Sequence, residues 1–228
     1  MGCRYCDDIF STSSPRETGV WNSILFESEH FVAVPTIGAL IEGWLLIITK
    51  RHYLCMGEIP DKLVEELDQF KCSVVQAVED CFGPVAIFEH GPSEPKQAVG
   101  CGVDHAHLHI VPTDCDILRC LPGVLADDLQ WAKGSGLRDA RKPHSVGLEY
   151  LYVEQPIGQA SLASSRGFES QLFRRVIAHY LGVPDRYDWK LHSGAENIRR
   201  TVDRITRWLD QQGLCVGSGC PGTEVTVR

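Results

Sequence analysis

The sequence predicts an α+β domain in which an antiparallel sheet carries one long helix. Residues 104–112, DHAHLHIVP, alternate histidines with small or aliphatic residues, and a period of two is typical of a β-strand. Residues 61–82 place apolar side chains at intervals of three or four, which is the period of a helix that buries one face. Short apolar runs lie on both sides of that helix. Strands around a single long helix give the α+β layout.

The first half of the chain contains the elements of a small sheet. Two apolar runs broken by polar residues predict a hairpin, and the continuous apolar run that follows it is typical of a buried strand. Two further strands are joined by a polar loop that contains glycine and proline. The expected strands are, in chain order, 24–26, 31–34, 43–50, 85–90 and 105–112. The helix begins after Pro60 and ends before Gly83-Pro84.

The character of the chain changes near residue 120. A short helix is expected within 121–134, a strand within 145–156, and amphipathic helices over 168–181 and 195–212. We therefore expect two parts, residues 1–120 with the sheet and the histidines, and residues 121–228 as a mixed, mainly helical extension packed on the first part.

Composition narrows the classes of function. The formal net charge is −8 and there is no basic block, so binding to a nucleic acid backbone is not expected. No run is long and apolar enough to span a membrane, and the N-terminus lacks the pattern of a signal peptide. We expect a cytoplasmic protein with reduced cysteines, and small phosphorylated ligands fit this composition.

The three histidines at 105, 107 and 109 would leave one face of their strand. Neighbours on one face are about 6.5–7 Å apart, so these rings can line one pocket but cannot easily share one metal ion. Imidazole is both a common metal ligand and a nucleophile that works near neutral pH. The row can therefore combine a metal ligand with a catalytic group.

A second pattern indicates a metal. Cys3 and Cys6 have the C-x2-C spacing of a tetrahedral zinc knuckle. Two further ligands are needed, and His52, at the end of the buried strand, is available beside His105.

HAHLHIVP resembles the signature of the histidine triad (HIT) superfamily of nucleotide hydrolases and transferases. CRYCDDIF is similar to the opening of its zinc-bearing members, and GWLLIITKRHY resembles their third strand. The stretch from VAIFEH to the histidines is especially similar to galactose-1-phosphate uridylyltransferases. The resemblance covers residues 3–112 and implies a HIT-like sheet.

The resemblance also implies roles for individual residues. His107 would attack the α-phosphorus of a nucleotide and form a nucleotidyl-histidine, while a backbone carbonyl near the first histidine accepts its other ring hydrogen. His109 would donate to the phosphate oxygens. Cys3, Cys6, His52 and His105 match the ligands of a structural zinc ion in the uridylyltransferases.

Several positions depart from the family pattern. Trp44 stands where many members have another histidine, and Gly102 stands where the family often has a serine near the phosphate. Thr36 aligns with the usual ribose ligand, and His90 replaces an asparagine of the uridylyltransferases. All four remain candidate nucleotide-binding positions.

An apolar slot for the base could form from Phe31, Val34 and Trp44, although Trp44 could equally be ordinary core. In the extension, Arg174 and Arg175 could reach a phosphate. A solvated helix face is the favoured interpretation of these two arginines. Lys190 and His192 are weaker candidates in a loop.

These observations predict a hydrolase that cleaves a nucleotidyl phosphoanhydride, phosphoester or phosphoramidate and releases a nucleoside monophosphate. A nucleotidyltransferase or phosphorylase that uses phosphate or a sugar phosphate is the alternative, and a non-catalytic, zinc-stabilised nucleotide sensor is the second. The expected partner is a nucleotide or nucleotide conjugate. Dimers are common in the family, and the extension could support or block a homodimer.

Overall fold

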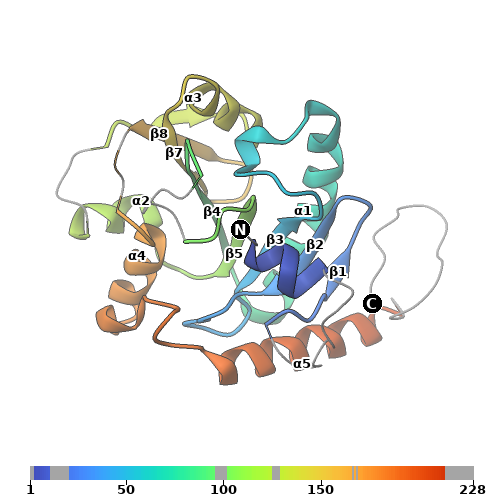
Figure 1. Cartoon of the computed structure of the whole chain (residues 1–228). Helices are drawn as coiled ribbons and strands as arrows, with labels where there is room; N and C mark the ends of the chain where they lie inside the picture. The colour runs from blue at the N-terminus through green and yellow to red at the C-terminus, as the bar shows by residue number, and fades with distance from the viewer. Residues whose placement is uncertain are drawn as a thin grey trace.

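An eight-stranded antiparallel sheet lies at the centre of the computed structural model (Figure 1), and it confirms the α+β class. The structure describes residues 3–10, 21–95, 102–124, 129–165, 167 and 169–213. The strand order is β1-β2-β3-β5-β4-β7-β8-β6. The strands are β1 (Phe26–Glu27), β2 (Phe31–Pro35), β3 (Leu45–Thr49), β4 (Val85–Gly91), β5 (His107–Pro112), β6 (Ala132–Gly134), β7 (Glu149–Glu154) and β8 (Ala160–Ser165).

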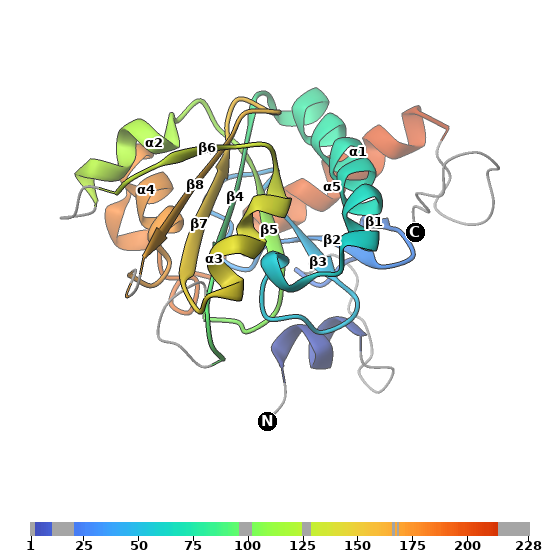
Figure 2. The ribbon, with the colours of Figure 1, turned by 90° about the horizontal axis from the view of Figure 1, so that it is seen from above.

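Helices cover both faces of this sheet. In Figure 2, α1 lies on one side of the strands while α2 and α4 lie on the other. The helices are α1 (Val64–Phe82), α2 (Ile117–Cys120), α3 (Arg141–Ser145), α4 (Leu172–Tyr180) and α5 (Ala195–Gln211), and a short helical segment, Cys6–Phe10, lies near the N-terminus. None of the helices within the described ranges is both long and apolar enough to cross a membrane.

The sheet continues across residue 120. β7 pairs with β4, so that His90 lies opposite Leu151, and β8 and β6 extend the sheet beyond β7. The sequence analysis missed β6 and β8, because neither AKG nor ASLASS has a clear apolar alternation. The expected helix within 121–134 was wrong for the residues described there. They form a single turn, Leu121–Gly123, and then β6, because Pro122 and Gly123 disfavour a longer helix.

The face of the sheet toward α1 is built from large apolar side chains. Leu108 and Ile110 of β5 pack there with Leu67, Phe70 and other residues of α1. Phe31 of β2 lies on the same face, with its ring centroid 6.2 Å from that of Phe70. The packing of α1 on this face forms the main core.

The opposite face is covered by α4, α2 and the N-terminal segment. Phe88 of β4 contacts Phe173 of α4, with ring centroids 4.6 Å apart, and Trp44 and Leu151 join this cluster. Further along the face, Tyr5 and Ile9 pack on Val34 and its neighbours. Because β5 alternates its side chains, His107 and His109 also point to this face.

Candidate functional site

His107 and His109 lie side by side on β5, in the middle of the sheet. His107 is paired with Ile48 and His109 with Leu46 on β3. Their ring centroids are 5.1 Å apart, and both side chains are buried. β5 begins at His107, two residues later than expected, and His105 precedes it.

The hydrogen bond of His107 fixes its tautomer. Its Nδ1 lies 2.6 Å from the carbonyl oxygen of His105. A carbonyl oxygen only accepts, so Nδ1–H is the donor and the Nε2 atom of the neutral ring carries the lone pair. Burial lowers the pKa of His107, and the neighbouring His90 lowers it further, against the opposing effect of the His105 carbonyl. This is the geometry that a nucleophilic imidazole requires.

His109 has the opposite tautomer. The indole Nε1–H of Trp44 donates to Nδ1 of His109 at 3.0 Å. The indole nitrogen can only donate, so the hydrogen of the neutral His109 ring is on Nε2. Burial, with smaller contributions from His107 and Arg174, keeps the pKa of His109 well below its usual value. His109 is therefore a neutral hydrogen-bond donor near neutral pH.

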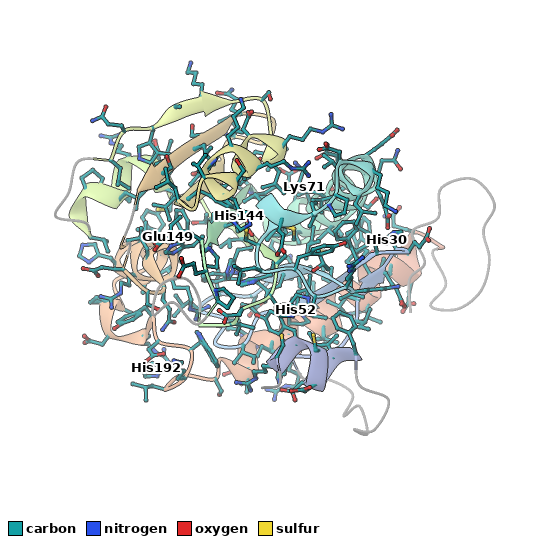
Figure 3. All side chains as sticks on the ribbon, turned by 45° about the horizontal axis from the view of Figure 1, so that its top comes forward. His30, His52, Lys71, His144, Glu149 and His192 are labelled. Atoms are coloured by element: carbon teal, nitrogen blue, oxygen red, sulfur yellow. The ribbon has the colours of Figure 1, made fainter. Side chains whose placement is uncertain are left out.

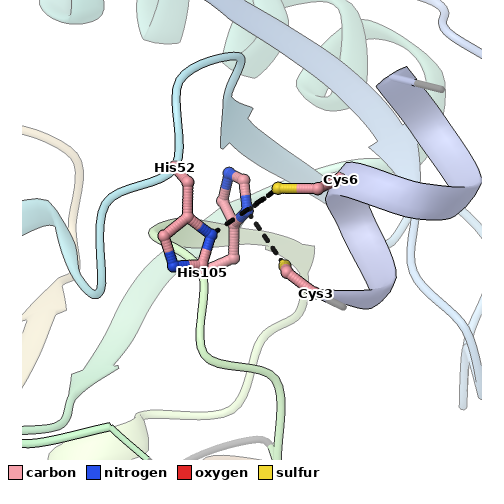
Figure 4. Close-up of side chains that lie close together, drawn as sticks. All are labelled: Cys3, Cys6, His52 and His105. Carbon is pink, nitrogen blue, oxygen red and sulfur yellow. Dashed lines mark hydrogen bonds between the residues drawn. The ribbon is translucent and has the colours of Figure 1, made fainter. Parts of the chain in front are cut away.

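Cys3, Cys6, His52 and His105 form one cluster (Figure 4), in which the four ligand atoms lie within 4.8 Å of one another. Nδ1 of His105 is 3.3 Å from Sγ of Cys3 and 3.5 Å from Sγ of Cys6, and Nδ1 of His52 is 3.6 Å from Sγ of Cys6. A tetrahedral zinc ion with ordinary bond lengths would separate sulfur and nitrogen ligands by about 3.5 Å. The four residues can therefore hold a metal ion.

The second ring nitrogen of His105 supports the same arrangement. Nε2–H donates to the carbonyl oxygen of Thr49 at 2.7 Å, which leaves the lone pair of Nδ1 toward the two sulfur atoms. Metal-binding histidines commonly donate their other N–H to a backbone carbonyl in this way. The same residue thus links the cluster to His107, whose hydrogen bond ends on the His105 carbonyl.

A small hollow of about 20 Å³ opens beside His109. Of the expected nucleotide-binding residues, Thr36 lines it, and Trp44 is fully buried behind His109. Val34 is buried beneath the N-terminal segment on the same face of the sheet. Phe31 does not reach the site, because it packs against α1 on the other face. The expected slot of Phe31, Val34 and Trp44 is therefore not formed.

His90 lies on the same face of the sheet, beside a carboxylate from the extension. Its Nε2 is 3.7 Å from Oε2 of Glu149, and both side chains are almost fully buried. Glu149 is at the start of β7 and is labelled in Figure 3. Sequence reasoning could not find this pair, since the register of β4 and β7 brings it together.

The expectation that Arg174 lies on a solvated helix face was wrong. Its side chain is 2% exposed and lines the hollow with His109. It donates to the carbonyl oxygens of Gly38 and Tyr187, and its guanidinium carbon is 4.9 Å from the centroid of the Trp44 ring. Arg175, in contrast, is only partly buried, and it pairs with Glu169.

Four other residues of the hollow were missed, Tyr5, Ile37, Val103 and Trp189. All four contribute to its wall, and the Tyr5 ring stands edge-on to His107 with centroids 5.5 Å apart. In the sequence, Tyr5 lies between the predicted zinc ligands Cys3 and Cys6, and Trp189 is next to Lys190. This closeness in sequence to candidate residues was the signal that could have indicated them. His192 lies at the outer edge of the molecule in Figure 3, away from His52.

The chain is similar to several known proteins. The sequence model of a family described as "Protein similar to CwfJ C-terminal" matches residues 13–125. Zinc finger CCCH domain-containing protein 64 of Arabidopsis thaliana is 27% identical over 198 residues, which are 79% of this chain and 31% of that protein. Protein hit of Bacillus subtilis is 28% identical over 88 residues, or 39% of this chain and 59% of that protein.

Among solved structures, a hypothetical histidine triad nucleotide-binding protein from Sulfolobus tokodaii aligns with a TM-score of 0.35 and 15% identity. The alignment covers 81% of this chain and 87% of that one. The chain spans less than two thirds of the length of the two curated relatives. Its sequence is thus similar to a HIT protein and to the C-terminal part of CwfJ-like proteins.

Proposed function

We propose that the protein is a nucleotidyl hydrolase of the HIT type, with His107 as the nucleophile. The observation that carries this proposal is the 2.6 Å hydrogen bond from Nδ1 of His107 to the His105 carbonyl, because it leaves the lone pair on Nε2. The small hollow beside His109, whose ring centroid is 5.1 Å from that of His107, is the place where we put the phosphate group.

The reaction would run in two displacements. In the first, Nε2 of His107 forms a bond to the α-phosphorus while the bond to the leaving group breaks and the leaving group takes the electron pair. In the second, water attacks phosphorus, the N–P bond breaks, and the ring nitrogen recovers its lone pair as a nucleoside monophosphate departs. Nε2–H of His109 would donate to a phosphate oxygen in both transition states.

The final acceptor in this proposal is water. A histidine at 109, unlike a neutral amide, can carry charge, and a charged ring would favour hydrolysis. The low pKa of His109 removes that reason, since the ring is neutral. What still supports hydrolysis is Gly102, which offers no hydroxyl to orient another acceptor.

We further propose that the bound metal is zinc and that its role is structural. Two thiolates and two imidazoles fill a tetrahedral shell and leave no open position for a substrate. The ion would pin residues 3–6 to His105 and so fix the carbonyl that orients His107. Elemental analysis should find one zinc ion per chain. Metal-free protein with an unchanged melting temperature would contradict this role.

The catalytic proposal is tested with a panel of nucleotide conjugates that differ in base and leaving group. We expect release of nucleoside monophosphate, and alkaline quenching, which preserves an N–P bond, with nucleotide labelled at the α-phosphorus should trap label on His107. His107→Ala should abolish both signals, whereas His179→Ala, at an exposed histidine in the last turn of α4, should keep them. Trapping on another residue would contradict the assignment.

The acceptor is tested by adding inorganic phosphate or a hexose phosphate to a turning-over reaction. Monophosphate should remain the main product. A switch to nucleoside diphosphate or nucleotide sugar would instead establish a transferase or phosphorylase.

A further inference from the structure

We propose that Lys190 binds a phosphate of the leaving group. Preferred substrates are therefore phosphoanhydrides, whose leaving group is a phosphate, rather than conjugates with an uncharged leaving group. This inference rests on the proposed function of His107, and it deepens it by naming the class of leaving group. It starts from the place where the chain lacks the family's serine, Gly102.

The structure puts an ammonium group beside that glycine. A Cβ atom added to Gly102 would lie 3.6 Å from Nζ of Lys190 and 3.8 Å from its Cε. Among the residues that the structure describes, no other atom outside the neighbouring residues comes within 4 Å of that position. The space into which a serine side chain would project therefore borders on the end of Lys190, which comes from the loop between α4 and α5.

This loop is held close to the site. The backbone N–H of Gly38 donates to the carbonyl oxygen of Ser193 at 2.8 Å. A Cβ on Gly38 would come within 2.5 Å of Cβ of Trp189, so only glycine allows the loop to approach this closely. At the other side, the backbone N–H of Lys190 donates to Asp188, which also accepts from Gln171. The backbone that carries Lys190 is thus fixed on both sides.

The charge of Lys190 is available to a ligand. The residue is exposed, and its charge helps to lower the pKa of the neighbouring Asp188, but among the described residues no carboxylate oxygen lies within 4.0 Å of its ammonium group. Its nearest aromatic neighbour is Trp189, whose ring centroid is 5.8 Å from Nζ. Trp189 lines the hollow that also contains His109 and Arg174.

A cation is needed on this side of the site. Breaking a phosphoanhydride bond transfers negative charge to the leaving oxygen and its phosphate, and a fixed positive group stabilises that charge. Burial lowers the pKa of His109, so this ring contributes a hydrogen bond but no charge. In this proposal the cation is the exposed ammonium of Lys190, because the guanidinium of Arg174 is buried and already donates to two backbone carbonyls.

The test compares two substrates with the same nucleotide. One has inorganic polyphosphate as its leaving group and the other, a phosphoramidate, has an uncharged amine. Lys190→Met should lower kcat/KM for the first by about 10- to 100-fold, which corresponds to one lost hydrogen bond to a charged group, and should leave the second within about threefold. Lys190→Arg should restore most of the activity. Lys142→Met, at an exposed lysine that pairs with Asp139, is the matched control.

A binding measurement separates this inference from the proposed function. Calorimetry with inorganic triphosphate should show about tenfold weaker binding to Lys190→Met than to the unaltered chain, and this holds even if no conjugate is turned over. Absence of turnover together with this binding difference would contradict the hydrolase and keep the anion site. Equal losses on both substrates, or unchanged triphosphate binding, would overturn the role of Lys190.

Discussion

The two faces of the sheet differ in chemistry although the same strands build both. Toward α1 the strands present Leu108, Ile110 and Phe31, and these side chains form the main core. Toward α4 the same strands present His107 and His109, and His109 lies against the rings of Phe88 and Trp44 in a second, smaller apolar cluster. A strand with a period of two can therefore assign stability to one face and chemistry to the other.

The strongest test of this division uses two adjacent residues of β5. His107→Ala should lower turnover by at least about 10³-fold, because it removes the proposed nucleophile, while the melting temperature changes little. Leu108→Ala should lower the free energy of unfolding by about 2–5 kcal/mol, because it opens a cavity beneath α1, while kcat per folded molecule is kept. Denaturant unfolding and steady-state kinetics on both variants measure the four quantities. The proposed division would be contradicted if His107→Ala lost mainly stability and Leu108→Ala lost mainly turnover. It would also be contradicted if either variant lost both turnover and stability to the full extent.

The metal cluster joins the two roles, so its loss should affect both. Cys3→Ser should reduce the zinc content well below one ion per chain and lower the melting temperature by about 5–10 °C, or roughly 2–3 kcal/mol for a chain of this size. Activity should fall less than in His107→Ala, since the nucleophile itself remains. Elemental analysis and differential scanning calorimetry provide the measurements, with Cys72→Ser, at an exposed cysteine of α1, as the control. A stable, zinc-loaded Cys3→Ser variant would remove Cys3 from the ligand set.

A substitution at Trp44 should have a smaller effect, on the face of the sheet that carries His107 and His109. Trp44→Phe keeps an aromatic ring but removes the N–H that donates to His109, so kcat should fall by about tenfold with little change in KM. Trp44→His, which can restore a ring N–H, should recover part of the loss. Nitrogen NMR of labelled histidine should show the tautomer of His109 becoming mixed in Trp44→Phe. An unchanged tautomer would mean that Trp44 only fills space.

The smallest expected effect lies at the edge of the α1 face. Burial would raise the pKa of Glu66, but hydrogen bonds from Ser28 and from the backbone and ring of His30 outweigh it, and the net pKa is lowered. The bonded carboxylate therefore adds stability above about pH 4.5, and that stability is lost as the pH falls through the lowered pKa. Glu66→Gln should cost about 1 kcal/mol at pH 7, and the difference from the unaltered chain should shrink below pH 4. Urea unfolding at both pH values checks this, and a difference that does not depend on pH would refute it.

Local patterns in the sequence were enough to predict most of the first half of the fold. The strands, α1 and the Cys3–Cys6 pair follow from spacing within short segments, whereas the full set with His52 and His105 was what the family resemblance implied. The error at Phe31 was avoidable, because Phe31 and Val34 are three residues apart on one strand and must point to opposite faces.

What the sequence could not show depends on contacts between distant parts of the chain. Arg174 reaches Gly38 across 136 residues, and Trp44 reaches His109 across 65. The helical spacing around Arg174 is compatible with either a solvated or a buried arginine, and only the packing of α4 on the sheet decides between them. Lys190 beside Gly102 is a contact of the same kind.

The pairing of β7 with β4 also affects how the chain can associate with itself. An unpaired strand at the rim of a sheet offers free backbone groups to another molecule, and short rims limit such growth. β7 occupies the open side of β4, and the two outermost strands, β1 and β6, are only two and three residues long. The extension thus prevents another molecule from adding a long strand beside β4. We therefore expect any homodimer to use helices or loops as its contact surface.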